Sequence, residues 1–333
     1  MMMTQAIPNT SVDYRKLLMQ DFKLVTPVVF LVFNRPDTTA RVFAEIAKAK
    51  PPKLFVIADG ARPHRHGEAQ LVAQTRAVVE RVDWPCEVLT HFSDVNLGCK
   101  LRVSTGLDWV FEQVEEAIIL EDDCLPTASF FQYCQELLTY HRGDLRVGVI
   151  SGDNFQADAS SCVDSYYFSK YIHIWGWATW RDRWVNHYDV GMSRWPKARD
   201  ERWLSRWSGS QQETNYWTSV FDRVTHGDID TWDYQWSFAN WLNGRLCCIP
   251  ARNMISNIGF RPDATHTRRN SDVANLPVYD MAFPLRHPAE VVADPLADAV
   301  TYKRCFHTPA WRRAMSRLLS RVRGVWPYSG ARA

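Results

Sequence analysis

The amino-acid sequence predicts an α/β fold with a mostly parallel central sheet flanked by helices. The first observation is that short apolar runs alternate with segments of helical periodicity between residues 26 and 126. This alternation is typical of parallel strands joined by right-handed helical crossovers. The second observation is that one apolar run, 117–120, ends abruptly in acidic residues and is followed by a proline. In open α/β sheets, ligands bind at the carboxyl ends of the strands, where these acids would lie.

The predicted elements of this first half follow one another without an internal repeat or a low-complexity linker. Pro36 and Asp37 are start signals for the first helix, because proline suits the first helical turn and acids favour the N-terminus. In chain order we expect a strand at 28–33, a helix from 36 to about 49, a strand at 54–58, a helix at 69–82, a strand at 86–92, a helix at 100–114 and the acidic strand.

Beyond about residue 153 the predicted strands become shorter, tryptophans become frequent, and polar helices such as 211–225 appear. Because no flexible linker separates the two parts, we expect them to share one cleft. The predicted organisation is an N-terminal extension at 1–25, an α/β half at 26–152, an aromatic-rich half of the same domain at 153–270 and a C-terminal extension at 271–333.

The composition excludes several classes of protein. With 333 residues and 15 tryptophans, the chain is long enough to bury a substantial core. A net charge of +2 gives no support to nucleic acid as a partner. The eight cysteines include no CxxC pair and no zinc-like Cys/His spacing, so buried, reduced thiols in a reducing compartment are expected.

The two ends of the chain bear on where the protein works. Residues 1–20 lack the apolar core of a signal peptide, and no apolar run is long enough to cross a bilayer. We therefore expect a cytoplasmic protein, either soluble or peripheral at the inner membrane. Residues 309–323 have the pattern of a basic amphipathic helix, which would either rest on an anionic membrane surface or pack its apolar face on the body.

Three consecutive acids, Glu121, Asp122 and Asp123, end the fourth predicted strand. Carboxylates this close repel one another and need a cation or solvent nearby. Hard oxygen ligands suit Mn²⁺ or Mg²⁺, and such an ion could hold a diphosphate through its oxygens. The alternative is that the acids stand at a helix N-terminus, where they favour the helix dipole.

Polar side chains also follow two other predicted strands. Arg35 comes after the first strand, and Asp59 ends the second before Gly60. A guanidinium can bind phosphate through two donors, and a carboxylate can accept a hydrogen bond from the N–H of a base. No GxGxxG follows the first strand and no GxxxxGK[ST] occurs, so the dinucleotide and P-loop interpretations lose their main support.

These segments, in this order, resemble the GT-A glycosyltransferases, and within them the inverting β-1,2-N-acetylglucosaminyltransferase I-like family and its bacterial family 2-like relatives. The resemblance covers roughly residues 26–270 and implies a GT-A fold, with nucleotide-sugar binding in 26–152 and acceptor binding and catalysis in 153–270. The matching residues are Phe33 to Pro36, Ala58 to Gly60, Glu121 to Asp123, Trp175 to Trp177, Trp232 with Asp233, and the segment from Pro250 to His266.

The resemblance also implies roles for the residues of the nucleotide half. Asp123, the last acid of the triplet, would bind the metal directly. Glu121 and Asp122 would contact the donor sugar and the ribose. Asp59 would read the uracil, and Arg35 would contact the nucleotide. UDP-N-acetylglucosamine is the donor that the resemblance suggests.

In the second half, the resemblance implies that Asp233, beside Trp232, is the catalytic base and that His266 is a distal contact to the diphosphate or metal. The chemistry agrees, because an inverting transfer needs one carboxylate to take the proton of the acceptor hydroxyl. Apolar surroundings from neighbouring indoles would raise the pKa of this carboxyl toward useful basicity. The alternatives are that Asp233 only caps the following helix, or that Asp228 or Asp230 is the base.

Two other motifs allow two interpretations each, and a third is assigned none. Trp175, Gly176 and Trp177 would form a wall for the donor sugar or acceptor, or would close the core against a loop. Residues 96–98 begin a predicted helix, whose N-terminus would contact phosphate or form an ordinary junction. The polar loop with His64 and His66 is assigned no chemistry.

We therefore expect a metal-dependent inverting glycosyltransferase that moves a sugar from a UDP-sugar to a hydroxyl of a glycan or lipid-linked oligosaccharide, in the synthesis of a bacterial surface polysaccharide. One alternative is a sugar-nucleotide pyrophosphorylase, which would want a glycine-rich basic loop after the first strand, where residues 34–37 read Asn-Arg-Pro-Asp. The other is a non-catalytic glycan-binding or scaffold protein that keeps the fold.

Overall fold

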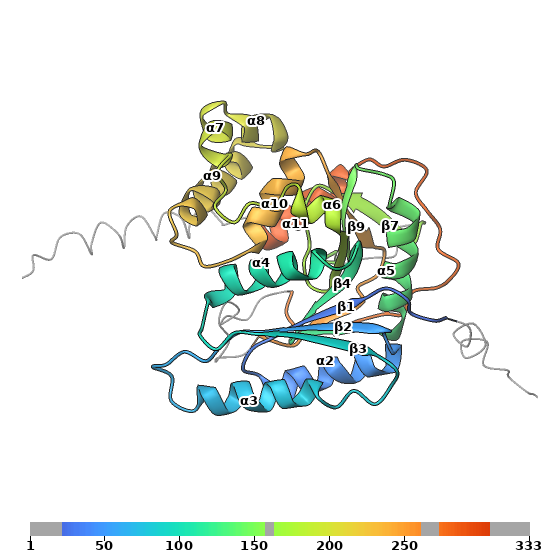
Figure 1. Ribbon diagram of the computed structural model, residues 1–333. Helices are drawn as coiled ribbons and strands as arrows, with labels where there is room; N and C mark the ends of the chain where they lie inside the picture. Colours follow the sequence, from blue (N-terminus) through green and yellow to red (C-terminus); the bar gives the residue numbers. More distant parts are fainter. Residues whose placement is uncertain (1–21, 157–162, 261–272, 307–333) are drawn as a thin grey trace, which may run out of the picture.

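The computed structural model describes residues 22–156, 163–260 and 273–306. Its centre is an eight-stranded sheet in the order β3-β2-β1-β4-β8-β6-β9-β7 (Figure 1). The strands are β1 (Val28–Val32), β2 (Lys53–Ala58), β3 (Glu87–Phe92), β4 (Glu116–Glu121), β6 (Val147–Ser151), β7 (Tyr166–Ser169), β8 (Trp177–Trp180) and β9 (Leu246–Pro250). A small antiparallel pair, β5 (Cys124–Pro126) with β10 (Ile255–Asn257), lies beyond the end of β4.

The helices flank the sheet on both faces, and the predicted α/β class with a mostly parallel central sheet is confirmed. The pairs β3-β2, β2-β1, β1-β4 and β6-β9 are parallel, whereas β8 runs antiparallel to β4 and β6, and β7 to β9. The helices are α2 (Pro36–Ala49), α3 (Glu68–Val79), α4 (Gly98–Phe111), α5 (Ala128–His141), α6 (Arg181–Val185), α7 (Trp195–Asp200), α8 (Trp203–Trp207), α9 (Gln211–Thr225), α10 (Asp233–Leu242) and α11 (Pro295–Thr301), followed by a π-helical turn at Tyr302–Phe306.

The alternation of side chains along the strands creates one core on each face of the sheet. All five residues of β1 are buried, as expected for a parallel strand covered on both sides. Val28 and Phe30 pack in the core beneath α2 and α5, whereas Val29 and Leu31 pack in the core beneath α4 and α10. Figure 1 shows α2 and α3 on one side of the first strands and α4 on the other.

The aromatic half supplies most of the second core. Trp177, Trp184, Trp232 and Trp236 are buried, with ring centroids between 5.0 and 6.4 Å apart along the cluster. Large rings bury much apolar surface at little cost in side-chain entropy, so this cluster fixes α6 and α10 against the sheet. The segments before α10 are thereby held beside the sheet edge.

The strand register decides which residues meet at the carboxyl edge of the sheet. Leu31 pairs with Ile57 on one side and with Glu121 on the other. The residues that follow, in 33–35, 59–60 and 122–123, therefore leave the same edge together. The strand order reverses between β1 and β4, which is the position where open α/β sheets form a crevice.

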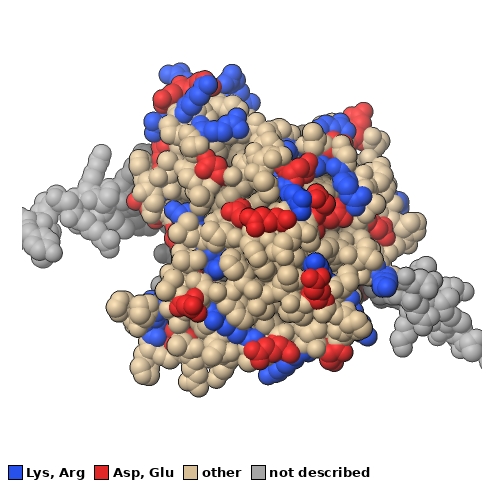
Figure 2. Space-filling view, viewed as in Figure 1, with Lys and Arg blue, Asp and Glu red and all other residues tan. Residues whose placement is uncertain are grey.

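Three further findings concern membrane-spanning helices, the cysteines and the surface charge. None of the described helices is long and apolar enough to cross a membrane. The predicted helix at 309–323 lies outside the described residues. The seven cysteines in the described part of the chain are free thiols, of which Cys124, Cys134, Cys247 and Cys248 are buried. Acidic and basic side chains are interspersed on the face in Figure 2, with a group of Lys and Arg over α7 and α8.

Candidate functional site

A cleft of about 600 Å³ lies at the carboxyl edge of β1, β2 and β4. This volume falls in the range of small-ligand sites, roughly 300–1,000 Å³. One wall comes from these strand ends and the start of α4, and the other from the loop before α10. It is lined by Leu31, Val32, Phe33, Arg35, Ile57, Asp59, Arg62, Asn96, Gly98, Cys99, Arg102, Val103, Glu121, Asp122, Asp123, Ile174, Trp175, Ile229, Asp230, Thr231, Trp232, Asp233, Tyr234 and Asn257.

The cleft brings together most residues that the sequence singled out, although they lie up to two hundred positions apart in the chain. Eight of them line it: Arg35, Asp59, Glu121, Asp122, Asp123, Trp175, Trp232 and Asp233. Gly176 and Trp177 do not line it, and His266 lies outside the described residues. The individual roles of the lining residues stay predictions.

The acidic triplet stands at a strand end, not at a helix N-terminus. β4 ends at Glu121, Asp122 and Asp123 form the following turn, and the next helix begins only at Ala128. The alternative interpretation of these acids as helix-terminal residues is therefore wrong. The backbone of Phe33, at the end of β1, donates its N–H to Asp122 Oδ2 at 3.1 Å.

Arg35 supplies the positive charge nearest to these acids. Its guanidinium donates to Asp123 Oδ2 at 2.7 Å and lies 3.7 Å from Asp122 Oδ1. Both partners are largely buried, at 17% exposure for the arginine side chain and 13% for that of Asp123. A charge-assisted bond this short, shielded from water, is stronger than a neutral hydrogen bond.

One arginine does not neutralise the whole group. Burial, followed by the negative charge of Asp123, raises the pKa of Asp122 to about 7, although Arg35 and the Phe33 amide oppose the rise. Burial and the charges of Asp123 and Asp122 also raise the pKa of Glu121 well above its usual value, and Asp233 adds to this rise. A further cation near these carboxyls would favour their ionised forms and so oppose the rise in their pKa values.

The donor set fits a divalent ion held jointly with a ligand. Among the described residues, no group of three or more His, Cys, Asp or Glu side chains is placed to hold a metal. Magnesium is usually bound by one or two carboxylates plus substrate phosphates, not by an all-protein cage. Asp122 and Asp123 provide such carboxylates, and the guanidinium already resting on them shows that a cation is accommodated there.

Gly259 presses against the carboxylate of Asp123. A Cβ at this glycine would lie 2.0 Å from Asp123 Oδ2, so no other residue fits without moving the acid. The neighbouring backbone is fixed, because Ile258 donates its N–H to the carbonyl of Asp123 at 2.8 Å and Gly259 donates to Asn257 Oδ1 at 2.9 Å. The sequence resemblance included this segment, but it did not indicate a contact with Asp123.

Asp59 is bound by the turn that starts α4. Its Oδ1 accepts from the amides of Gly60 and Leu97, both at 2.9 Å, and its Oδ2 accepts from Gly98 at 3.0 Å and from the side chain of Asn96 at 2.9 Å. Four donors match the lone-pair capacity of a carboxylate. Asp59 therefore holds this turn in place, and a contact with a base, as predicted from the resemblance, would have to share or displace one of these donors.

Asp230, from the loop before α10, also accepts hydrogen bonds from the N-terminus of α4. It accepts from the amides of Cys99 at 3.1 Å and Lys100 at 3.2 Å. Gly98 allows this approach, since its φ is +79° and a Cβ there would lie 2.6 Å from Asp230 Oδ2. The first amides of α4 are thus all engaged by protein groups, as in an ordinary junction, and a phosphate contact at this helix end finds no free donor among them.

Asp233 is the first residue of α10 and lines the cleft. The helix is not capped by a side chain, and its N-cap residue is Trp232, so Asp233 is not the helix cap that the sequence offered as an alternative. The hydroxyl of Thr231 donates to Asp233 Oδ1. Asp230 is hydrogen-bonded to the first amides of α4, and Asp228 does not line the cleft. Of the three acids, Asp233 therefore stays the predicted catalytic base.

The two tryptophans of the motif at 175–177 lie in different environments, one at the cleft and one in the core. Trp175 lines the cleft, and its backbone N–H donates to Asp153 at 3.1 Å. Trp177 is fully buried and stacks on Trp232 at 5.4 Å, which corrects its predicted role as a direct wall for substrate. Gly176 has a φ of +62° and a Cβ there would lie 2.5 Å from Ile255, so this glycine serves the backbone and the core packing.

Asp153, which the sequence did not mark, holds this segment in place through hydrogen bonds. Besides the amide of Trp175, it binds Nδ1 of His173, and both partners are nearly inaccessible. The ring of His173 stacks on Phe155 at 4.6 Å. Packing between separate elements, which no short motif records, creates these contacts of Asp153. Arg102, which the sequence placed near the start of the helix at 100–114, also lines the cleft.

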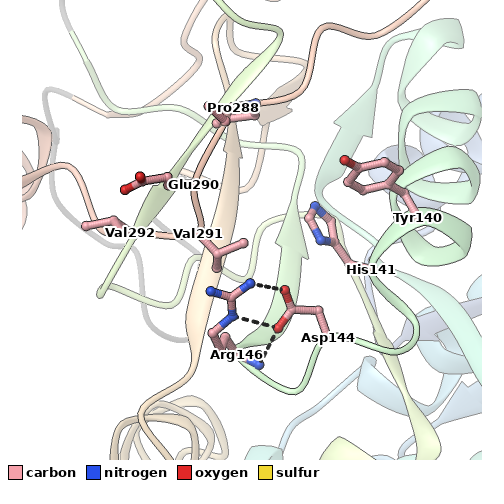
Figure 3. A pocket seen from close by; sticks show the side chains of 9 residues that line it. Tyr140, His141, Asp144, Arg146, Pro288, Glu290, Val291 and Val292 are labelled. Carbon is pink, nitrogen blue, oxygen red and sulfur yellow. Dashed lines mark hydrogen bonds and ion pairs between the residues drawn. The ribbon is translucent and has the colours of Figure 1, made fainter.

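A second hollow of about 440 Å³ lies away from these residues, between the end of α5 and segment 288–292 (Figure 3). Two of its charged groups are paired with each other, because Arg146 binds Asp144 through two nitrogens at 2.9 and 2.7 Å. His141, at its base, binds the hydroxyl of Tyr166 at 2.8 Å.

No family model matches the chain, and no curated protein matches it. Solved structures to which it is similar include UDP-glucose pyrophosphorylase complexed with UDP-glucose, at 9% identity and a TM-score of 0.26. That comparison covers 44% of this chain and 62% of the other, so the chain spans less than two thirds of that protein. A second is 4-diphosphocytidyl-2C-methyl-D-erythritol synthase from Anaerococcus prevotii, at 10% identity, 66% and 99% coverage and a TM-score of 0.30.

A third similar structure is apo UDP-glucose pyrophosphorylase, at 7% identity, 67% and 90% coverage and a TM-score of 0.32. At such low identities and TM-scores, the likeness carries no argument about the activity. The residues of the cleft have to carry that argument.

Proposed function

We propose that the protein is a metal-dependent inverting glycosyltransferase of the GT-A type, with a UDP-sugar as donor and a hydroxyl of a glycan or lipid-linked oligosaccharide as acceptor. The observation that carries the proposal is the composition of the cleft. An arginine and a strand-end acid triplet stand on one wall, and a carboxylate at a helix start, Asp233, stands on the other. A diphosphate needs the first group of residues, and an attacking hydroxyl needs the second.

The donor would lie along the carboxyl edge of the sheet, with its diphosphate against Arg35 and Asp123. Arg35 can donate two hydrogen bonds to phosphate oxygens. When bound, a divalent cation at Asp123 and Asp122 would neutralise the diphosphate as it leaves. Trp175, partly buried on the cleft wall, offers a flat ring against which a sugar ring can pack.

The chemical step would use Asp233 as general base. Its carboxylate takes the proton of the acceptor hydroxyl while the hydroxyl oxygen attacks the anomeric carbon from the face opposite the diphosphate. The bond between the anomeric carbon and the diphosphate oxygen breaks, and its electron pair leaves with UDP. A positioned base of this kind typically contributes about 10²–10⁴-fold to the rate.

A sugar-nucleotide pyrophosphorylase is the second candidate. The names of the similar solved structures fit it better than they fit a glycosyltransferase. The loop after β1 speaks against it, since only Phe33, Asn34 and Arg35 lie between β1 and α2, and none is glycine. Such an enzyme has to bind the triphosphate of a nucleotide and release pyrophosphate, for which this short loop offers one arginine. A non-catalytic glycan-binding protein is the third candidate.

The test is the release of UDP from a panel of UDP-sugars with Mn²⁺, beside the release of pyrophosphate from UTP with a panel of sugar 1-phosphates. The glycosyltransferase proposal expects UDP release by the native protein, none by Asp123→Ala, and a loss of at least about 10²-fold in Asp233→Asn with UDP binding retained. Asp228→Asn, on the same loop but outside the cleft, is the matched control and keeps the native rate. Pyrophosphate release alone would favour the second candidate, and binding without turnover would favour the third.

A further inference from the structure

The backbone of Arg35 is anchored at the start of α2, while its side chain extends to the acid pair. It precedes α2, and its carbonyl accepts from the amide of Thr39 at 3.0 Å and from the hydroxyl of Thr39 at 2.7 Å. These bonds fix the main chain at the first turn of the helix. The side chain crosses from this anchor to Asp123, and its one side-chain hydrogen-bond partner among the described residues is that acid.

The other described cations of the cleft are bound elsewhere. Arg62 is held by Glu68 through several hydrogen bonds, including a backbone contact at 2.7 Å. Arg102 binds Nδ1 of His91 at 2.7 Å. Among the cleft residues that the structure describes, the positive charge in contact with the acid triplet therefore comes from Arg35.

The position of this charge conflicts with the proposed metal. The guanidinium occupies Asp123 Oδ2 and faces Asp122 Oδ1, and Gly259 lies against the same Asp123 oxygen, where a Cβ would be only 2.0 Å away. A divalent ion that binds Asp123 Oδ2 and Asp122 Oδ1 competes with the guanidinium for these oxygens, because two cations in that space would repel each other. One of them has to be elsewhere when the other is present.

We propose that Arg35 is an exchangeable internal counter-cation, which holds the acid pair while the cleft is empty and transfers to the diphosphate when metal and nucleotide arrive together. This inference rests on the proposed function. The exchange keeps the number of charge pairs constant, because the guanidinium leaves a carboxylate for a phosphate while the metal ion takes its place. It follows that free metal binds weakly, since it has to displace a guanidinium whose ion-pair partners among the described residues are these same two acids.

Mn²⁺ titration monitored by electron paramagnetic resonance tests the exchange without any turnover. The proteins are the native chain, Arg35→Gln, Arg35→Lys and the control Arg65→Gln, whose exposed side chain does not line the cleft. Without nucleotide, we expect Arg35→Gln to bind Mn²⁺ about tenfold more tightly than the native protein, which corresponds to ~1.4 kcal/mol. With saturating UDP the order reverses, because the variant has lost its phosphate contact.

The conservative variant and the control make the result specific. Arg35→Lys keeps the positive charge and should stay close to the native protein, as should Arg65→Gln, and thermal unfolding midpoints show that each variant is folded. Equal or weaker Mn²⁺ binding by Arg35→Gln without nucleotide overturns the exchange, as does Arg35→Lys binding as tightly as Arg35→Gln. If the native protein binds no Mn²⁺ even with UDP, the proposed function itself fails, and that result is distinct from the first two.

Discussion

Asp59 and Asp230 share the N-terminus of α4 and accept hydrogen bonds from four successive backbone amides, those of residues 97–100. The first acid comes from the end of β2, and the second from the loop that carries Asp233. Amides at a helix start have no partners within the helix, so acids from elsewhere in the chain can satisfy them. The start of α4 therefore joins the strand-end wall of the cleft to the loop of the proposed base.

The first prediction concerns this junction. Asp230→Ala removes the acceptor for Cys99 and Lys100 and should lower the free energy of unfolding by about 0.5–2 kcal/mol, as for a lost helix cap. Because the loop to Asp233 loses its anchor, the transfer rate should fall more than the affinity for UDP. Asp230→Asn keeps an acceptor oxygen and should restore most of both properties. Equal losses in the alanine and asparagine variants would show that charge, not anchoring, matters here.

The second prediction concerns Gly259. In Gly259→Ala the new Cβ would meet the Asp123 carboxylate, so we expect the acid to shift and the affinity for Mn²⁺ with UDP to fall at least about tenfold, ~1.4 kcal/mol. Gly143→Ala is the control, because nothing lies within 4 Å of a Cβ there. Calorimetric titration measures both. Native affinity in Gly259→Ala would mean that Asp123 is not held where a ligand needs it.

The third prediction separates the two tryptophans of one motif. Trp177→Ala removes a fully buried ring stacked on Trp232 and should cost about 3–5 kcal/mol of stability. Trp175→Ala removes a ring at the cleft wall and should weaken donor or acceptor binding with a much smaller loss of stability. Urea unfolding and steady-state kinetics distinguish the two outcomes. The reverse pattern would place Trp177, not Trp175, at the substrate.

The fourth prediction is a pH dependence of stability caused by His141. Burial lowers the pKa of this ring from 6.5 to about 4. Between these values the unfolded chain binds a proton that the folded protein does not, so stability falls as the pH falls through this window. At about 1.4 kcal/mol per pKa unit, the loss reaches at most roughly 3 kcal/mol.

Chemical unfolding of the native protein and of His141→Gln between pH 7.5 and 4 measures this contribution. The glutamine variant should be the less stable protein at pH 7.5, because it loses the bond to Tyr166, and the difference should shrink toward pH 4. His226→Gln, at an exposed position, should follow the native curve. Parallel curves for the native protein and His141→Gln would assign the pH dependence to other groups.

The first half of the fold could be predicted almost element by element. The expected helix from 36 to about 49 coincides with α2, and the expected strand at 54–58 lies within β2. Local signals suffice there, because each buried strand is a continuous apolar run and α2 begins with Pro36 and Asp37, which favour a helix start. The resulting sheet edge also gathers Arg35, Asp59 and the acid triplet, since parallel strands in register end together.

The second half could not be predicted in the same way. β8 has four residues, and its insertion between β4 and β6 depends on pairing with strands far away in the sequence. The burial of Trp177 follows from that pairing, in which it lies opposite Ile119. Likewise, the cap on α4 comes from a residue 130 positions away, so no pattern around residues 96–100 could reveal it.

The place of β6 in the sheet limits the order in which the chain can fold. Within the described sheet, β6 pairs with β8 and β9 and not with any strand that precedes it. As the polypeptide leaves the ribosome, residues 147–151 thus have no strand partner until residues 177–180 and then 246–250 have been made. Cutting the chain near residue 152 would leave β4 with a bare edge and β6 unpaired. We therefore expect the two halves to fold as a single cooperative unit, and neither to be recovered folded when produced alone.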